Sequence, residues 1–97
     1  VYPLCKYMSE KMFKIKEHIG KKVLVYSKFF GKENRTFIVY IGILVGFGDK
    51  FIVLKNCEAL IYRLEDNGKA IKIGTMYKIP VNVIGWGVIS NVAFLEE

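Results

Sequence analysis

The residues with the clearest chemical potential are two aromatic side chains, one acid and one lysine in a stretch of five positions. They are Phe47, Asp49, Lys50 and Phe51, and Gly48 lies between them. An exposed aromatic ring can stack on an unpaired nucleic-acid base, while a lysine neutralises a phosphate. The alternative is that such large aromatic residues are buried in the core or in a subunit contact, as is usual in apolar chains. The stretch therefore predicts either a nucleic-acid site or a packing cluster.

Groups suited to catalysis or metal binding are scattered along the chain. The single histidine, His18, is expected near a helix end, where a positive charge favours the helix dipole, and no acid or nucleophile accompanies it at a telling spacing. Cys5, His18 and Cys57 are too far apart for a metal-ligand motif, and the glycines around Phe47 lack the Lys-Ser/Thr of a phosphate loop. We expect no enzyme activity, no metal and no cofactor.

The net charge of +6 is concentrated in the first third of the chain. Residues 1–35 contain nine bases and three acids, whereas residues 36–97 contain six of each. Phosphate backbones and anionic surfaces are the usual partners of such an excess. A solvated lysine-rich face that keeps the protein soluble explains it equally well.

Alternating apolar residues predict the strands that position these groups. Residues 36–48 are dominated by β-branched and aromatic side chains on both faces, with Phe37, Val45 and Phe47 on the same face. The glycine-rich turn that follows predicts a hairpin whose second strand starts at Phe51. Further strand patterns cover residues 22–28, 51–54, 59–64, 70–79, 81–84 and 88–95. Lys55-Asn56 is expected to interrupt a strand, Asn67-Gly68 to form a primed hairpin turn, and Pro80 to lie in an edge or bulged strand.

A short helix should precede these strands. Ser9 can cap a helix over residues 9–19, Gly20 can end it in a left-handed conformation, and Met12, Ile15 and Ile19 form its apolar stripe. Residues 1–8 show no period and are expected to be a flexible extension. The 97 residues thus predict one mainly β domain, with a short N-terminal helix and a bent five-stranded antiparallel barrel of SH3 or OB type over residues 21–95.

Composition predicts self-association and a reducing compartment. A hydrophobic content of 53% is high for so small a domain and favours an apolar surface that other copies of the chain cover. The alternative is an unusually apolar core within one subunit. Apolar runs are too short or too interrupted to span a membrane, and the N-terminus lacks the layout of a secretory signal. With two cysteines, of which Cys57 is expected in the core, a cytoplasmic location follows.

The order of these features resembles the Sm and Sm-like family, which includes the bacterial Hfq proteins. The segment Ile19 to Val25 resembles the family's opening hydrophobic-Gly-x-x-Val-x-Val pattern, and Gly42 to Asp49 resembles the strand that ends in Gly-aromatic-Asp. Ile52 to Glu58 resembles the apolar strand closed by an acid. Val83-Ile84-Gly85 followed by Val88 to Leu95 echoes the family's second motif. The resemblance implies an Sm-like barrel, a homo-oligomeric ring of six or seven subunits, and binding of single-stranded RNA or service in an RNA–protein particle.

The residues that read RNA in the family are not all present here. The family's base-contacting Asn falls at Phe51 or Ile52, and its Arg falls at Ile84, so an amide and a guanidinium are both lost. By resemblance the hairpin tip should lie beside Gly85 and Trp86. The candidate nucleic-acid residues are therefore Phe47, Asp49, Lys50, Phe51, Gly85 and Trp86. The alternative is a structural or interaction barrel that oligomerises without a nucleotide pocket.

Overall fold

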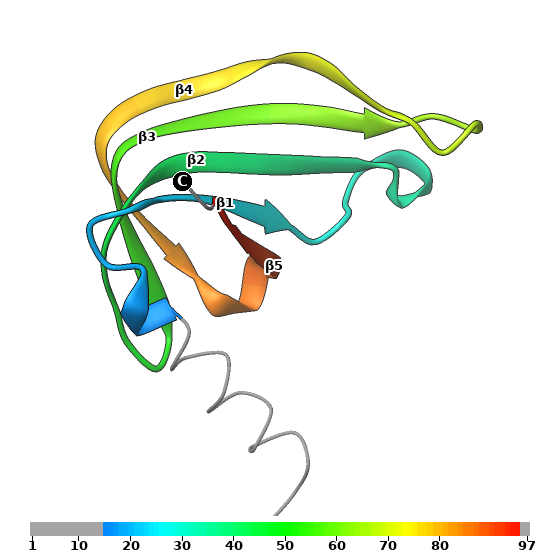
Figure 1. The fold of residues 1–97 in the computed structure, drawn as a ribbon. Coiled ribbons are helices and arrows are strands. Elements are labelled where there is room, and N and C mark those ends of the chain that lie inside the picture. Colours follow the sequence, from blue (N-terminus) through cyan, green and yellow to red (C-terminus); the bar gives the residue numbers. More distant parts are fainter. Residues whose placement is uncertain (1–14, 96–97) are drawn as a thin grey trace, which may run out of the picture.

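The alternating sequence forms five antiparallel strands in a computed structural model, which describes residues 15–95. The elements are β1 (Lys22–Ser27), η1 (Lys32–Asn34), β2 (Thr36–Phe47), β3 (Phe51–Leu64), β4 (Ala70–Gly85), η2 (Trp86–Val88) and β5 (Ile89–Phe94) (Figure 1). All five strands belong to one sheet in the order β4-β3-β2-β1-β5. The prediction of a mainly β fold with five antiparallel strands is confirmed.

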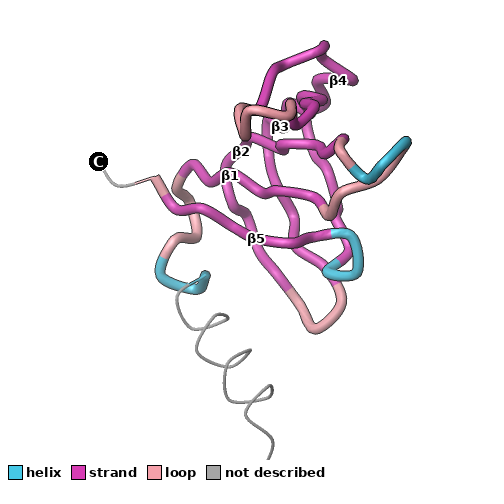
Figure 2. The backbone as a smooth tube through the Cα atoms, turned by 90° about the vertical axis from the view of Figure 1, so that its right-hand side faces the viewer, coloured by secondary structure: helices cyan, strands magenta, loops and turns pink. Residues whose placement is uncertain are grey.

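The sheet is strongly bent but does not close. β2, β3 and β4 curve over at one end of the molecule, and β4 and β5 occupy the two edges (Figures 1 and 2). Over residues 15–95 no ladder joins these two edges. The expected barrel is therefore an open, bent sheet, because each edge strand pairs with only one other strand among the described residues.

The bend depends on a close approach of β2 and β3 at Gly42. A Cβ at this position would lie 3.0 Å from the Lys55 carbonyl oxygen and 3.1 Å from the Leu54 Cβ. Opposite it, Asn56 adopts a φ of 51°, and the β2–β3 register shifts between the pairs at Ile41 and Ile43. The expected interruption at Lys55-Asn56 is thus a bulge inside one continuous strand.

The turn between β3 and β4 also differs from the expectation. Gly68 has a φ of 83°, but Asn67 stays at negative φ, whereas the type I′ turn favoured by Asn-Gly needs positive φ at both central residues. The Gly68 N–H donates to the Glu65 carbonyl at 3.0 Å, and the Glu65 N–H donates to the Lys69 carbonyl at 2.8 Å. Beyond the turn, β4 runs through Pro80 without a break, which the sheet permits because β4 is an edge strand, as predicted.

The core lies on the concave face of the bend. Its largest fully buried side chains come mainly from β1, β2 and β3 and are Ile15, Val23, Val25, Leu44, Ile52, Leu54 and Cys57. The prediction that Cys57 is a small core residue is confirmed. Burial raises the pKa of its thiol, which favours the protonated form.

The chain enters the sheet through the end of a helix. Residues 15–17 are helical, Gly20 has the expected left-handed φ of 89°, and the Gly20 N–H donates to the Leu44 carbonyl at 2.7 Å. Ile15 is buried as predicted, but Ile19 is 47% exposed because it follows the last helical residue. Ser9, Met12 and the extension over residues 1–8 lie outside the described residues. Across residues 15–95 no helix has the length and apolarity to cross a membrane.

Candidate nucleic-acid interface

The β2–β3 turn is held against the connection between β4 and β5. The Trp86 N–H donates to the Lys50 carbonyl at 3.0 Å, and its indole Nε1 donates to the Gly48 carbonyl at 2.9 Å. Phe51, the first residue of β3, pairs with Gly85, the last residue of β4. The predicted proximity of the turn to Gly85 and Trp86 is confirmed, and Trp86 is the residue that fastens the two segments together.

Two of the candidate aromatic residues pack inward. Phe47 and Trp86 are partly buried against the hydrophobic core. Phe47 pairs with Ile52 because the register shifts between the pairs at Leu44 and Gly46. The prediction that Phe47 shares a face with Phe37 and Val45 is therefore wrong: the bulge reverses the alternation before the strand ends.

The solvent side of the turn carries one ring and two charges. Phe51 is 43% exposed, and Asp49 and Lys50 are exposed. The Phe51 ring leans over the turn, since a Cβ at Gly48 would lie 3.4 Å from its Cζ. The turn can thus offer one stacking surface and one phosphate partner, with an adjacent carboxylate that weakens the attraction for an anion.

The two positions at which the family has polar RNA readers behave differently here. Ile84 is 4% exposed and pairs with Ile52, which is fully buried. The side chains at positions 52 and 84 therefore pack in the core, and only Phe51 of the two Asn candidates reaches solvent. This tip carries no base-reading amide or guanidinium at those positions.

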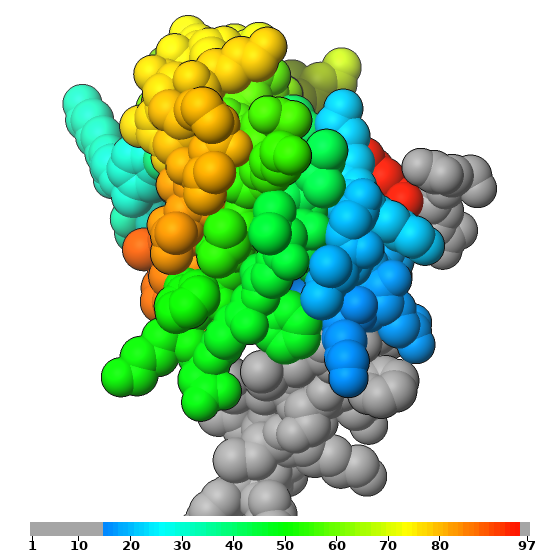
Figure 3. Space-filling view, turned by 90° about the vertical axis from the view of Figure 1, so that its left-hand side faces the viewer, coloured from blue at the N-terminus to red at the C-terminus, as the bar shows by residue number. Residues whose placement is uncertain are grey.

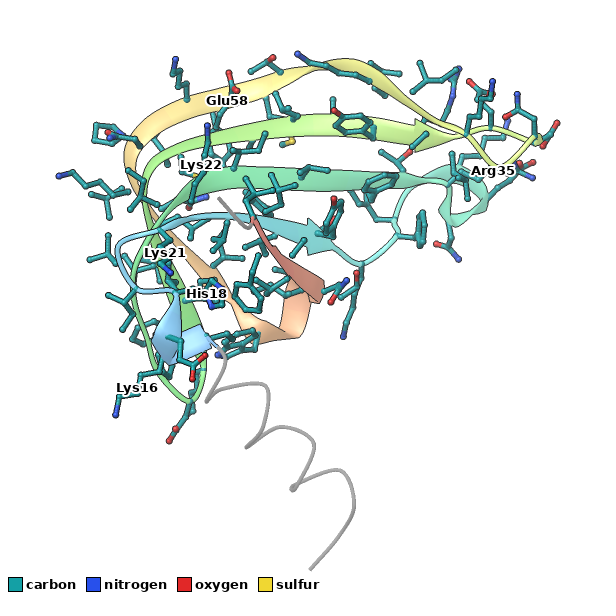
Figure 4. All side chains as sticks on the ribbon, viewed as in Figure 1. Lys16, His18, Lys21, Lys22, Arg35 and Glu58 are labelled. Carbon is teal, nitrogen blue, oxygen red and sulfur yellow. The ribbon has the colours of Figure 1, made fainter. Side chains whose placement is uncertain are left out.

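The basic first third of the chain is exposed where the structure describes it. Lys16, Lys21 and Lys22 lie toward the bent side of the sheet (Figure 4). Arg35, at the far end of β2, is ion-paired instead: its guanidinium lies 2.7 Å from Asp66 and 3.3 Å from Glu33. His18, expected as a surface residue at a helix end, is half-buried and stacks on the Phe94 ring at 4.1 Å. Within the described ranges no three metal-ligating side chains gather.

Sequence reasoning missed a second group of aromatic residues. Tyr26, Phe29, Phe37 and Tyr62 form a connected set of rings at the opposite end of β2 and β3 from the turn. We call these four residues the aromatic stack. Their positions in the sequence gave no indication of contact, because they meet only through the pairing of β1, β2 and β3.

The comparisons with known proteins support the fold. No family model and no curated protein matches the chain. Among solved structures, the fold is similar to that of a heptameric archaeal Sm protein, with a TM-score of 0.50 and 24% sequence identity. The match covers 87% of this chain and 98% of the archaeal one. The resemblance in sequence order thus corresponds to an Sm-like fold.

Proposed function

We propose that this protein assembles into a closed ring of identical subunits and binds single-stranded RNA, or organises an RNA–protein particle, at the hairpin tips. The observation that carries the proposal is the pair of unpaired edges, β4 and β5, at opposite ends of one bent sheet. An unpaired edge presents free ladder groups that other chains can satisfy. The heptameric state of the archaeal Sm protein with a similar fold supports the same assembly.

The side chains of β4 also favour association. Exposed apolar residues follow one another along this strand and are Ile71, Ile73, Met76, Val81 and Val83. A lone subunit leaves this apolar surface in water, and a neighbouring subunit would remove it. Because β4 and β5 are different surfaces, their contact is head-to-tail, and it forms a ring when the rotation between subunits closes.

The mass of the protein in solution tests the assembly. Light scattering coupled to size exclusion, at micromolar concentration, should give six or seven times the subunit mass of 11.2 kDa. A monomer at that concentration contradicts the ring.

RNA binding is tested separately. In low salt, a short unstructured RNA should bind, and its affinity should fall steeply as salt increases, because lysine contacts release counterions from the phosphates. Lys50→Ala and Phe51→Ala should weaken binding at the tip. The absence of binding in low salt contradicts this part of the proposal and leaves the ring untouched.

The alternative is a ring that serves only as an interaction scaffold. Its support is the buried Ile84, together with Phe51 in the only solvent-facing Asn candidate position. The ratio of absorbance at 260 and 280 nm after purification distinguishes the two, since co-purified nucleic acid raises it.

A further inference from the structure

The aromatic stack is a continuous group of rings that spans three strands. The Phe37 and Tyr62 rings lie parallel, with centroids 5.6 Å apart and an interplanar angle of 17°. Phe29 meets Phe37 edge-on at 5.4 Å, and Tyr26 lies 6.4 Å from Phe37 on the other strand. Phe29 is 50% exposed, and the other three rings are half-buried. The rings hold one another in place while part of their surface stays open to solvent.

Strand register places this stack on the face of the sheet opposite the core. Val23 and Val25 point into the core, so Tyr26 points the other way, and its cross-strand partner is Val39. Phe37 shares the face of Val39, and Phe37 pairs with Tyr62. Val39 and Leu60 are each 6% exposed but lie outside the core cluster, so this outer face has its own apolar base.

The charges on the outer face are almost all positive. Register places Lys72 directly opposite Tyr62, and it places Lys22 and Lys55 on either side of Ile43. Lys78 pairs with Glu58, which is the only acidic residue within the described strands. The outer face of the strands therefore carries four exposed lysines and one half-buried carboxylate. Viewed from the bent side, β4, β3, β2 and β1 form one uninterrupted surface (Figure 3).

Polar groups lie at the border of the stack. An open cavity of about 470 Å³ is lined by Tyr26, Phe29, Phe37, Ser90 and Asn91, among others. An asparagine amide and a serine hydroxyl are the kinds of group that donate to and accept from the edges of a base.

We propose that the aromatic stack and the outer-face lysines form a second surface for single-stranded nucleic acid, separate from the hairpin tip. Bases would stack on the exposed parts of the Phe29, Phe37 and Tyr62 rings, and phosphates would lie against Lys72 and the lysines beyond it. Aromatic rings offer every base a stacking partner, and the excess of lysine matches a polyanion. A neutral or basic peptide would gain nothing from these lysines, and an acidic peptide would bring no bases to stack on the rings. The combination of rings and lysines therefore favours nucleic acid as the occupant.

The test measures binding of fluorescein-labelled 12-nucleotide RNA and DNA by anisotropy in low salt. Phe29→Ala and Tyr62→Ala should each weaken binding by between about 5-fold and about 160-fold, the range for loss of one stacked base. Tyr62→Phe keeps the ring and should bind like the wild type. Lys72→Ala should weaken binding and reduce its salt dependence by about one counterion.

Matched variants separate this surface from its surroundings. Phe30→Ala removes the next aromatic residue, which is 40% exposed and lines a different cavity of about 380 Å³, and Lys69→Ala removes an exposed lysine in the β3–β4 turn. Both should leave binding unchanged. Thermal unfolding and the mass in solution should be the same for all variants whose binding is compared.

Several results overturn the proposal. The proposal is overturned if Phe29→Ala and Tyr62→Ala both bind nucleic acid as tightly as the wild type. It is also overturned if Phe30→Ala loses as much affinity as Phe29→Ala, or if the wild type binds no nucleic acid. Phe51→Ala reports on the hairpin tip alone, so a protein that is sensitive at Phe29 but not at Phe51 supports this surface and contradicts the tip. A preference for RNA over DNA identifies which nucleic acid the surface takes.

Discussion

At the residue scale, polar groups at the border of the core are hydrogen-bonded to one another, and two titratable groups there favour their protonated forms. The Asn82 amide donates to the Tyr77 hydroxyl at 2.9 Å and contacts the Cys57 sulfur at 3.6 Å. Burial is the main cause that raises the pKa of Cys57, and it also raises the pKa of Tyr40, with a further contribution from Tyr77. These groups therefore favour the folded state only while they keep their protons.

Alkaline pH should destabilise the protein through these two groups. Their folded-state pKa values lie above the ordinary 9.0 of cysteine and 10.0 of tyrosine, so their contribution is complete below those values and is lost as pH rises through the folded ones. Urea unfolding at pH 8 to 11 should show a falling midpoint. Cys57→Ala should make the fall shallower, and a fall of equal slope in that variant would contradict the assignment to Cys57.

Introducing an arginine at position 84, as in the second motif of Sm-like proteins, should damage the fold. Ile84 is 4% exposed, so Ile84→Arg places a charge in the core without a partner and should cost about 3–5 kcal/mol of unfolding free energy. Thr75→Arg, on an exposed position of the same strand, should change stability by less than about 0.5 kcal/mol. Chemical denaturation measures both, and an unaffected Ile84→Arg would mean that this side chain can leave the core.

At the element scale, the bend of the sheet is set where β2 passes β3. Gly42 is the position at which the two strands come too close for a side chain, and the Asn56 bulge lies opposite. The long strands β2, β3 and β4 can turn over the core only because this contact is possible. A second register shift, between the pairs at Leu44 and Gly46, turns Phe47 inward.

Alanine substitutions along β2 should distinguish the bend from the rest of the strand. Gly42→Ala should destabilise by about 1–3 kcal/mol, because its Cβ would meet the Lys55 carbonyl at 3.0 Å and backbone would have to shift. Gly46→Ala has no atom within 4 Å of the added Cβ and should be neutral or slightly stabilising. Equal unfolding free energies for the two variants would show that the bend does not need glycine at position 42.

At the scale of the whole molecule, two open edges and an apolar strand determine how copies can meet. The described chain satisfies its own core but leaves β4 unpaired along one side. Val81 and Val83 are 57% and 60% exposed on this strand. Strand addition along this edge would cover them.

Lysines on the β4 edge should release single subunits. Val81→Lys with Val83→Lys should shift the mass in solution toward the monomer, because charged edge residues oppose strand addition. Val45→Lys changes an apolar residue that is 49% exposed on an interior strand and should leave the mass unchanged. Light scattering measures the mass of both variants in solution, and circular dichroism checks that each is folded. A ring that persists in the double variant would mean that subunits meet through another surface.

The sequence by itself determined the strands, the left-handed stop at Gly20, the edge position of Pro80 and the core position of Cys57. These follow from local alternation, from backbone conformations that only some residues adopt, and from the missing N–H of proline. It also indicated that the hairpin tip lies beside Gly85 and Trp86, although that proximity came from a resemblance rather than from spacing.

Only the tertiary structure decided which side chains share a face beyond a bulge, which strands remain open, and which aromatic rings meet. Phe47 turned inward because one shift in register reverses every later side chain, and nothing in the local pattern marks that shift. Phe37 and Tyr62 stack although they lie in different strands, since strand pairing joins residues that are distant in the chain. Local sequence determines the tendency of each strand, whereas long-range pairing determines its neighbours.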